Sequence, residues 1–383
     1  MTGSGARLRV SLDVSAVPVS PAGAGRYTLE LAAALARRHD LDLVAVARRD
    51  DAGRWKDAGS VVAAAPAARP VRLGWEQLVL PRVLRAAGVA VHHGPHYTMP
   101  ERSRAPVVVT VHDCTFFDHP EWHERSKVVV FRRAIRVAAR RAAVIVCVSA
   151  TTAERLRHFC PVEAPLVVAP HGVDHSRFAP QAPVPGADEG TLRRLGLEPG
   201  RPYILFVGTV EPRKDVPGLV SAFGRVADAH PDAMLVIAGR DGWGGHEVDR
   251  ALASVGPARR RVLRTGYVPD DAVPGLLRQA AVVAYPSLAE GFGLPALEAL
   301  ACGAPLVTTT GTAMAELAGP AALTVRPGDA ADLASAIDEV LSAGVTDPAV
   351  AERRRLGLEV AAGCTWGASA ARHVDAYRMA AGG

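Results

Sequence analysis

Two glutamates stand eight residues apart in the stretch 286–298, which reads PSLAEGFGLPALE. Glu290 ends a predicted loop, and Glu298 lies about one turn into a helix predicted to begin near Leu294. Glycines let the loop backbone approach a ligand closely, and the amides that open the helix form an anion site. Acids on either side of an anion site suit a sugar nucleotide, although a structural corner with hydrated acids explains the spacing equally well. The loop residues expected to contact the ligand are Gly291, Phe292, Gly293 and Leu294.

A second candidate segment follows the apolar run 203–207, which is predicted to be a buried parallel strand. Gly208 and Thr209 come directly after this strand, and the adjacent cations Arg213 and Lys214 follow. A glycine-containing loop with two cations can neutralise a diphosphate. The alternative is a surface turn with two hydrated cations. The position at the carboxyl end of a strand, where open α/β sheets bind ligands, favours the phosphate site.

The first half of the chain holds two further candidate segments. Gly23 and Gly25 follow the first predicted strand and open a helix, but Thr28 replaces the third glycine of a dinucleotide fingerprint, and the loop before the helix is ten residues long. A plain helix-capping loop remains the alternative there. His112 and Asp113 follow the predicted strand 107–111, again at its carboxyl end.

Together these segments resemble the retaining glycosyltransferases of family 4, which have the GT-B fold and use nucleotide-sugar donors. The resemblance extends over nearly the whole chain and is most specific in the glutamate pair around Gly-Phe-Gly. It implies that the Gly23–Gly25 loop closes over the donor phosphates and that His112 contacts the donor sugar. It also implies that Asp113 orients His112 or touches the acceptor. By the same resemblance, Glu290 contacts the transferred sugar, Glu298 the ribose hydroxyls, and Val268 the nucleobase.

The activity implied by this resemblance is transfer of a hexose from a GDP- or UDP-sugar, with retention of configuration, to a saccharide, lipid-linked or small-molecule acceptor. Arg213, Lys214 and the amides of Gly293 and Leu294 would stabilise the departing diphosphate. No Asp-x-Asp pair stands after a predicted strand, so we expect no metal, and we expect no cofactor. A GT-B nucleotide-sugar epimerase and a non-catalytic nucleotide-binding module remain alternatives.

Composition restricts the class of protein further. A length of 383 residues favours two domains, and 5% aromatic residues without an aromatic-interleaved basic stretch disfavour nucleic acid as a partner. Five scattered cysteines without a C-x-x-C pair indicate a reducing compartment and argue against structural zinc. His92, His93 and His96 cluster, but no further metal-ligand group accompanies them. No apolar signal core opens the chain and no apolar run approaches ~20 residues, so we expect a cytoplasmic protein.

Alternating strands and helices predict two Rossmann-like, doubly wound parallel sheets facing a central cleft, which is an α/β architecture. The strands are expected at 8–13, 43–47, 89–92, 107–111, 143–148, 166–169, 203–207, 234–238, 262–264, 281–285, 305–308 and 323–325. The main helices of the first half are expected at 26–38, 75–87, 126–141 and 150–159. A linker at 181–190 separates a domain 1–182 from a donor-binding domain 190–362, and by resemblance the segment 363–383 forms a helix that packs back on the first domain.

The predicted helix 126–141 carries Arg132, Arg136 and Arg140 on one face, beside several valines. Such a face can rest on an anionic membrane, so peripheral contact with the inner face of the cell membrane is one interpretation. A basic face that is only hydrated is the commoner outcome for a helix of this kind.

Overall fold

Two parallel sheets organise the computed structural model, which describes residues 7–242 and 245–382. The chain folds into two compact units. Unit 1 contains residues up to Gly172 together with the segment from Thr365 onwards, and unit 2 runs from Val173 to Cys364. Among the described residues, no helix combines the length and the apolar character needed to cross a bilayer.

Unit 1 is built on a seven-stranded sheet in the order β3-β2-β1-β4-β5-β6-β7, in which all pairings are parallel. The order reverses between β1 and β4, which makes that junction the topological switch point of the sheet. The strands are β1 (Leu8–Asp13), β2 (Leu41–Arg48), β3 (Ser60–Ala65), β4 (Val91–Gly94), β5 (Val107–Val111), β6 (Val144–Cys147) and β7 (Leu166–Val168).

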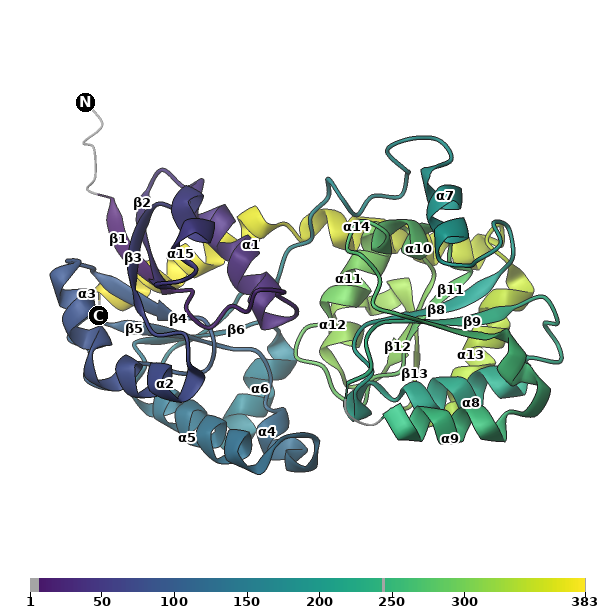
Figure 1. The fold of residues 1–383 in the computed structure, drawn as a ribbon, viewed down its shortest axis with the longest axis horizontal. Helices are drawn as coiled ribbons and strands as arrows, with labels where there is room; N and C mark the ends of the chain where they lie inside the picture. The colour runs from purple at the N-terminus through teal and green to yellow at the C-terminus, as the bar shows by residue number, and fades with distance from the viewer. Residues whose placement is uncertain (1–6, 243–244, 383) are drawn as a thin grey trace. The chain divides into compact units, whose positions relative to one another are not determined.

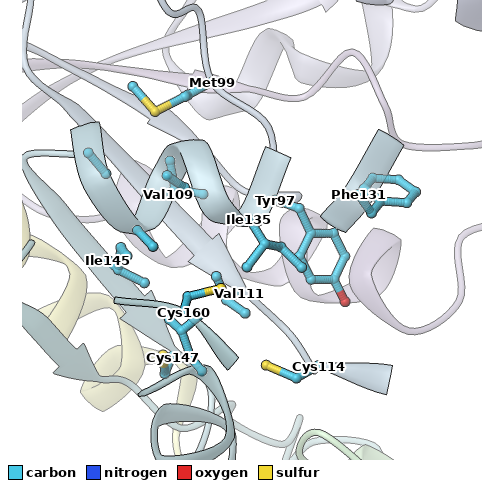
Figure 2. Close-up of a cluster of buried hydrophobic side chains, with 14 of the residues drawn as sticks. Tyr97, Met99, Val109, Val111, Cys114, Phe131, Ile135, Ile145, Cys147 and Cys160 are labelled. Atoms are coloured by element: carbon cyan, nitrogen blue, oxygen red, sulfur yellow. The ribbon is translucent and has the colours of Figure 1, made fainter. Parts of the chain in front are cut away.

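The helices of unit 1 cover a core in which strands rich in valine meet apolar helix faces. Figure 2 shows one buried cluster of this core, where Val109 and Val111 of β5 meet Phe131 and Ile135 of α5. Burial raises the pKa of the Cys147 thiol in this cluster to about 12, so the thiol is inert at neutral pH. The helices are α1 (Ala24–Ala36), η1 (Ala52–Ala58), α2 (Arg69–Leu78), α3 (Leu80–Ala86), α4 (Thr115–Asp118), η2 (Pro120–Trp122), α5 (Arg125–Arg141), α6 (Ala150–Phe159) and α15 (Trp366–Gly382).

The last helix, α15, packs against α1 and against strands of unit 1, and its yellow ribbon lies among the purple and blue elements in Figure 1. Buried polar groups fasten it there. Nε2 of His373 lies 2.8 Å from the hydroxyl of Tyr27, and the hydroxyl of Tyr377 lies 2.8 Å from Nδ1 of His93. All four side chains are completely shielded from solvent. The expectation that the terminal helix packs back on the first unit is therefore confirmed.

Unit 2 has a six-stranded sheet in the order β10-β9-β8-β11-β12-β13, again wholly parallel. Its switch point lies between β8 and β11. The strands are β8 (Tyr203–Val207), β9 (Met234–Ala238), β10 (Val262–Gly266), β11 (Val282–Tyr285), β12 (Leu306–Thr309) and β13 (Ala322–Val325). The helices are α7 (Ala187–Arg194), η3 (Pro212–Lys214), α8 (Val216–Val226), α9 (Gly245–Ser254), η4 (Gly256–Arg261), α10 (Val273–Gln279), α11 (Leu294–Ala301), α12 (Ala313–Ala318), η5 (Gly319–Ala321), α13 (Ala330–Ala343) and α14 (Pro348–Gly363).

Two Rossmann-like parallel sheets confirm the predicted fold class, but local details differ. The predicted helix 75–87 is two helices that meet at Val79, because Pro81 in the first turn of α3 cannot donate to the preceding turn. The edge strand β3 was missed because its sequence, SVVAAA, is half alanine, a residue depleted in strands.

The stretch 181–190, expected to be a linker, contains the start of α7. Asp188 of this helix forms a buried ion pair with Arg278, at 2.6 Å, and both side chains are less than a tenth exposed. This pair fixes the stretch firmly within unit 2. The division between the units accordingly falls earlier, between Gly172 and Val173.

Candidate functional site

Except for Val268, the residues that the sequence singled out in the second half of the chain lie in the two loops at the switch point of unit 2 and in the helix that follows. Gly208 directly follows β8, and Glu290 lies in the loop that follows β11, the neighbouring strand. Because parallel strands end at the same edge of the sheet, both loops rise from one edge. The amide of Leu288 donates to the carbonyl of Arg213 at 2.7 Å and so joins the two loops directly.

Gly208 makes room for the ammonium group of Lys214. Its φ of 146° is a conformation that residues with a side chain rarely adopt, and a Cβ placed there would stand 2.6 Å from Nζ of Lys214. Nζ also lies 5.9 Å from the centre of the Phe206 ring. Burial, with Arg213 beside it, lowers the pKa of Lys214. The site therefore holds a half-buried ammonium group next to a backbone conformation that favours glycine.

Arg213 differs from its neighbour because two carboxylates already surround it. Its Nη1 lies 2.5 Å from Oε1 of Glu290, and its Nε lies 3.0 Å from Oε2 of Glu211. Within the described part of the chain, no carboxylate lies within ion-pair distance of Lys214. The two cations were predicted to act alike on a diphosphate. In the structure, Arg213 is ion-paired with Glu290 and Glu211, whereas the same two carboxylates act on Lys214 only from beyond ion-pair distance.

The loop that carries Glu290 continues into α11, whose first residue is Leu294. Gly293 precedes it with a φ of 95°, and a Cβ there would stand 2.2 Å from Cγ of Met314. Glycine at this position therefore lets the chain turn sharply into the helix, whose amide end carries a partial positive charge. Phe292 is buried beside this turn, and Gly291 and Leu294 are half-buried.

Glu298 lies one turn further along α11 and is half-buried. Its carboxylate acts on the buried Tyr285, whose pKa is raised chiefly by burial and secondly by Glu298. Thr209 is half-buried beside Gly208, and Val268 is buried in the turn after β10, two strands away from β8. The proposed contact of Val268 with a nucleobase stays a prediction.

Unit 1 holds the remaining predicted residues, and His112 is the best positioned among them. Its Nε2 lies 2.8 Å from the carbonyl of Pro95 and must be the donor, because a carbonyl only accepts. Burial lowers the pKa of His112, so the ring is neutral and Nδ1 carries a lone pair. The rings of Tyr27 and Tyr97 stand nearly perpendicular to it, with centroids 4.9 and 5.6 Å away. The structure thus sets His112 up to accept a hydrogen bond at Nδ1.

Asp113 does not orient His112, contrary to one of the roles that the resemblance suggested. Its carboxylate accepts hydrogen bonds from the hydroxyl of Tyr97 at 3.0 Å and from the amide and hydroxyl of Thr115 at 2.9 and 2.6 Å. It therefore stabilises the turn that follows β5, while the Pro95 carbonyl orients His112.

Tyr27 connects the glycine loop before α1 with His112, and it was not among the predicted site residues. Gly23 has a φ of 49° and caps α1, and Gly25 packs on Pro21. Tyr27, one turn into the helix, places its ring against His112. A tyrosine that follows two glycines at a helix start was visible in the sequence, but only the fold shows which histidine it meets.

The histidines before His112 serve the interior of unit 1. His93 contacts the hydroxyls of Tyr377 and Thr110, and Nδ1 of His92 contacts the hydroxyl of Ser11 at 2.9 Å. No group of three histidine, cysteine or acidic side chains suited to a metal ion occurs within residues 7–242 and 245–382.

Two family models match the chain in succession. Residues 21–177 match the model described as Glycosyltransferase Family 4, and residues 189–357 match that described as Glycosyl transferases group 1. A similar curated protein is the O-antigen chain mannosyltransferase B of Escherichia coli, 29% identical over 293 residues, which are 76% of this chain and 74% of that protein.

Solved structures show a similar fold. The sucrose-phosphate synthase of Thermosynechococcus elongatus superposes with a TM-score of 0.79 at 20% identity, over 97% of this chain and 98% of that one. The Anabaena protein HepE, solved with UDP and glucose, gives a TM-score of 0.74 at 16% identity, over 96% and 99% of the two chains.

Proposed function

The chain belongs to glycosyltransferase family 4 and has the GT-B fold, and from this premise we propose that it moves a hexose from a nucleoside diphosphate sugar to a hydroxyl group of an acceptor. We further propose that the anomeric configuration is retained. Unit 2 would hold the donor, because its switch point combines the cations and the helix start that a diphosphate needs. Unit 1 would hold the acceptor.

One observation carries the proposal: Lys214 lies beside Gly208 at the end of β8, with no described carboxylate within ion-pair distance, next to the loop that leads into α11. Negative charge on a departing diphosphate would be offset by this ammonium group and by the amide end of α11. The partial burial of Lys214 strengthens such an interaction, because fewer water molecules can screen it. These two features would replace the divalent cation that other diphosphate sites use, so we propose that transfer needs no metal.

The acceptor proton needs a destination when the new glycosidic bond forms. We propose front-face attack, in which the acceptor oxygen bonds to the anomeric carbon, the bond to the diphosphate breaks, and a departing phosphate oxygen takes the proton. His112 would orient a sugar hydroxyl through its Nδ1 lone pair without serving as a base. Glu290, held by Arg213, would accept a hydrogen bond from the transferred sugar.

The donor is proposed to be a GDP- or UDP-hexose. The similarity to an O-antigen mannosyltransferase and the fold shared with a protein solved with UDP and glucose support a role in polysaccharide or glycolipid synthesis. A thermal-shift comparison of UDP, GDP and ADP would identify the base, because a ligand of the native state raises stability by RT ln(1 + [L]/Kd).

In the decisive experiment, the full chain is incubated with EDTA, a panel of acceptors, and hexose donors that carry the nucleoside diphosphate identified by thermal shift. NMR then follows the signal of the anomeric proton. A new glycoside with the donor's anomeric configuration is expected. An isomerised nucleotide sugar without a glycoside would indicate an epimerase instead. Strict dependence on added magnesium or manganese would contradict the assigned role of Lys214.

A further inference from the structure

Asp215, the residue that follows Lys214, has a left-handed backbone, with a φ of 45° and a ψ of 44°. Among the non-glycine residues that the structure describes, only Tyr97 shares a positive φ. The left-handed conformation is unfavourable for most L residues, and asparagine and aspartate adopt it more readily than the others. Backbone strain of this kind persists only where the surrounding structure enforces it, and it gathers at functional sites. The strain at Asp215 therefore points to a role in the neighbouring candidate site.

The side chain of Asp215 fixes this backbone from the side of α8. Its Oδ1 accepts a hydrogen bond from the amide of Gly218 at 3.1 Å and so caps the helix. The carbonyl of Asp215 accepts from the amide of Leu219, also at 3.1 Å. A Cβ at Gly218 would stand 2.3 Å from the carboxylate of Asp215, so a glycine there leaves room for the cap. Asp215 is thus tied to the first turn of α8 by both its side chain and its main chain.

The turn before Asp215 is also fixed by hydrogen bonds. The amide of Lys214 donates to the carbonyl of Glu211 at 2.9 Å, and the amide of Asp215 donates to the carbonyl of Pro212 at 3.2 Å. The short helix η3 therefore ends, and α8 begins, at the left-handed residue between them. With the chain held in this way, the ammonium group of Lys214 lies next to Gly208, at the end of β8.

Capping of α8 alone does not explain the left-handed backbone. Asp329 and Asp347 cap α13 and α14 through the same kind of side-chain hydrogen bond, yet their φ values are −97° and −61°. Electrostatic attraction does not explain it either, because Asp215 forms no ion pair within residues 7–242 and 245–382. The conformation of Asp215 therefore serves the placement of the residue that precedes it.

We propose that Asp215 is a positioning residue for Lys214. Its left-handed backbone and its hydrogen bond to α8 hold the half-buried ammonium group against Gly208, where this group would meet the departing diphosphate. That meeting rests on the proposed function, whereas the placement of Lys214 does not depend on turnover.

Three substitutions of Asp215 separate its backbone, its cap and its charge. Asp215→Asn keeps a residue that tolerates the left-handed backbone and a capping oxygen, Asp215→Gly keeps the backbone alone, and Asp215→Ala keeps neither. Asp215→Ala should lower kcat about tenfold, because the left-handed conformation costs an ordinary L residue an amount that corresponds to about a tenfold change in population. Asp215→Gly should be intermediate, and Asp215→Asn should restore most of the activity.

The matched control for these variants is Asp347→Ala, which removes a helix cap elsewhere in unit 2 at a residue with an ordinary backbone. It should lower the stability of unit 2 without changing kcat. Circular dichroism and denaturant unfolding of all four variants show that each one is folded under the conditions of the assay.

The position of Lys214 can be observed directly, because the chain has only three lysines, at positions 56, 127 and 214. In a protein labelled with ¹³C-lysine, Lys56→Arg and Lys127→Arg identify the other two signals. Nζ of Lys214 lies 5.9 Å from the centre of the Phe206 ring, so the ring current should shift the Hε signal of Lys214 upfield of the other two. This shift should persist in Asp215→Asn and in Asp347→Ala, and it should diminish in Asp215→Ala. Loss of stability alone would not move this signal in the folded protein.

Two results would overturn the assignment. One is an Hε signal of Lys214 that is the same in Asp215→Ala as in the wild type. The other is an Asp215→Asn variant that is as impaired as Asp215→Ala, which would show that Asp215 acts through its charge. If Asp215→Ala moves the Lys214 signal but the wild-type chain transfers no sugar, the positioning role stands and the proposed reaction fails.

Discussion

The phenolic oxygen of Tyr27 lies 2.8 Å from Nε2 of His373, although 346 positions separate the two residues in the chain. Nδ1 of His373 donates to the carbonyl of Ser369 at 2.7 Å, and burial lowers the pKa of His373 to about 4, so the ring is neutral and Nε2 must accept from Tyr27. The hydroxyl of Thr110 must then donate to the oxygen of Tyr27, 2.9 Å away.

The same reasoning fixes the rest of this chain of hydrogen bonds. Since the hydroxyl hydrogen of Thr110 is used, Nε2 of His93 donates to Thr110 at 2.8 Å, and Nδ1 of His93 accepts from Tyr377. Five hydrogen bonds therefore run in one direction, and both ends lie on α15. In a buried chain of this kind each bond polarises the next.

Removal of the Tyr27 hydroxyl from this series of hydrogen bonds should destabilise unit 1. We expect Tyr27→Phe to lower the free energy of unfolding of unit 1 by about 1–3 kcal/mol, because Nε2 of His373 loses its donor and stays buried. Denaturant unfolding measures the change. Tyr285→Phe is the matched control in unit 2: the buried hydroxyl of Tyr285 has no hydrogen-bond partner among the described residues, so its removal should cost little. An equal loss in both variants would contradict the directional chain.

Substitutions of Gly208 and Lys214 should have coupled effects on catalysis. Lys214→Ala should lower kcat by about 10²–10³, the scale for losing one preorganised charge-stabilising donor. Gly208→Ala should produce a similar loss because its methyl group would stand 2.6 Å from Nζ and displace it, and the double variant should be little worse than either single one. Gly74→Ala, in an open position of α2, is the control and should retain full activity. Additive losses in the double variant would refute the coupling.

Substitution of Glu298 should mainly affect nucleotide binding, whereas substitution of Glu290 should mainly affect sugar transfer. Glu298→Ala is expected to weaken binding of the free nucleoside diphosphate by roughly 1–3 kcal/mol, the range for losing a charged hydrogen-bonding partner. Glu290→Ala should leave that binding nearly intact and reduce transfer or sugar selectivity. Isothermal titration gives both dissociation constants. Loss of nucleotide binding in Glu290→Ala alone would reverse the two assignments.

The units should respond to acid in opposite directions. The lowered pKa of His373, from 6.5 to about 4, contributes stability to unit 1 that is complete above pH 6.5 and lost as the pH falls towards 4, roughly 3 kcal/mol in all. In unit 2, burial raises the pKa of Asp215 to about 6, so its contribution is present at low pH and lost as the pH rises through 6. Hydrogen exchange should be measured at pH 7 and pH 5 and corrected for the intrinsic exchange rate at each pH. The protection of backbone amides should fall from pH 7 to pH 5 in unit 1 only. Parallel acceleration of both units would refute this.

The exposed face of α5 is proposed to touch an anionic membrane. Val129 is 70% exposed there and lies among the exposed Arg125, Arg136 and Arg140. Arg132, which the sequence placed on this face, instead donates to the carbonyl of Phe116 at 2.6 Å. Val129→Asp should reduce co-sedimentation with vesicles containing phosphatidylserine, whereas Val71→Asp, on an exposed face of α2, should not. Unchanged binding in Val129→Asp would leave α5 as a hydrated surface.

The features that were predicted best from the sequence are those that depend on neighbouring residues along the chain. β8 and β9 have the expected bounds because strands buried on both faces are continuous apolar runs bounded by turns. The loop around Glu290 was recognisable because its glycines and its proline have fixed backbone preferences.

Features that depend on partners distant in the chain were not predictable. Nothing in the sequence around Glu76 indicated that this acid would be buried and would accept a hydrogen bond from Thr98. The ion pair of Arg213 with Glu290 likewise requires the pairing of two loops that are 77 positions apart. The partners of His373 and Tyr377, which are Tyr27 and His93, likewise could not be inferred from the sequence of the helix that carries them.

The placement of α15 in unit 1 also determines the order in which the molecule can be assembled. Domains usually fold in the order in which the ribosome delivers them, the N-terminal one first. Here unit 2 is continuous from Val173 to Cys364, while unit 1 needs a segment that is translated after it. During synthesis, Tyr27 and His93 cannot form their hydrogen bonds with His373 and Tyr377 until the whole of unit 2 has been translated. The half of the protein that is made first is therefore the half that is finished last, and a chain that ends before Trp366 contains all of unit 2 but lacks the helix that completes unit 1.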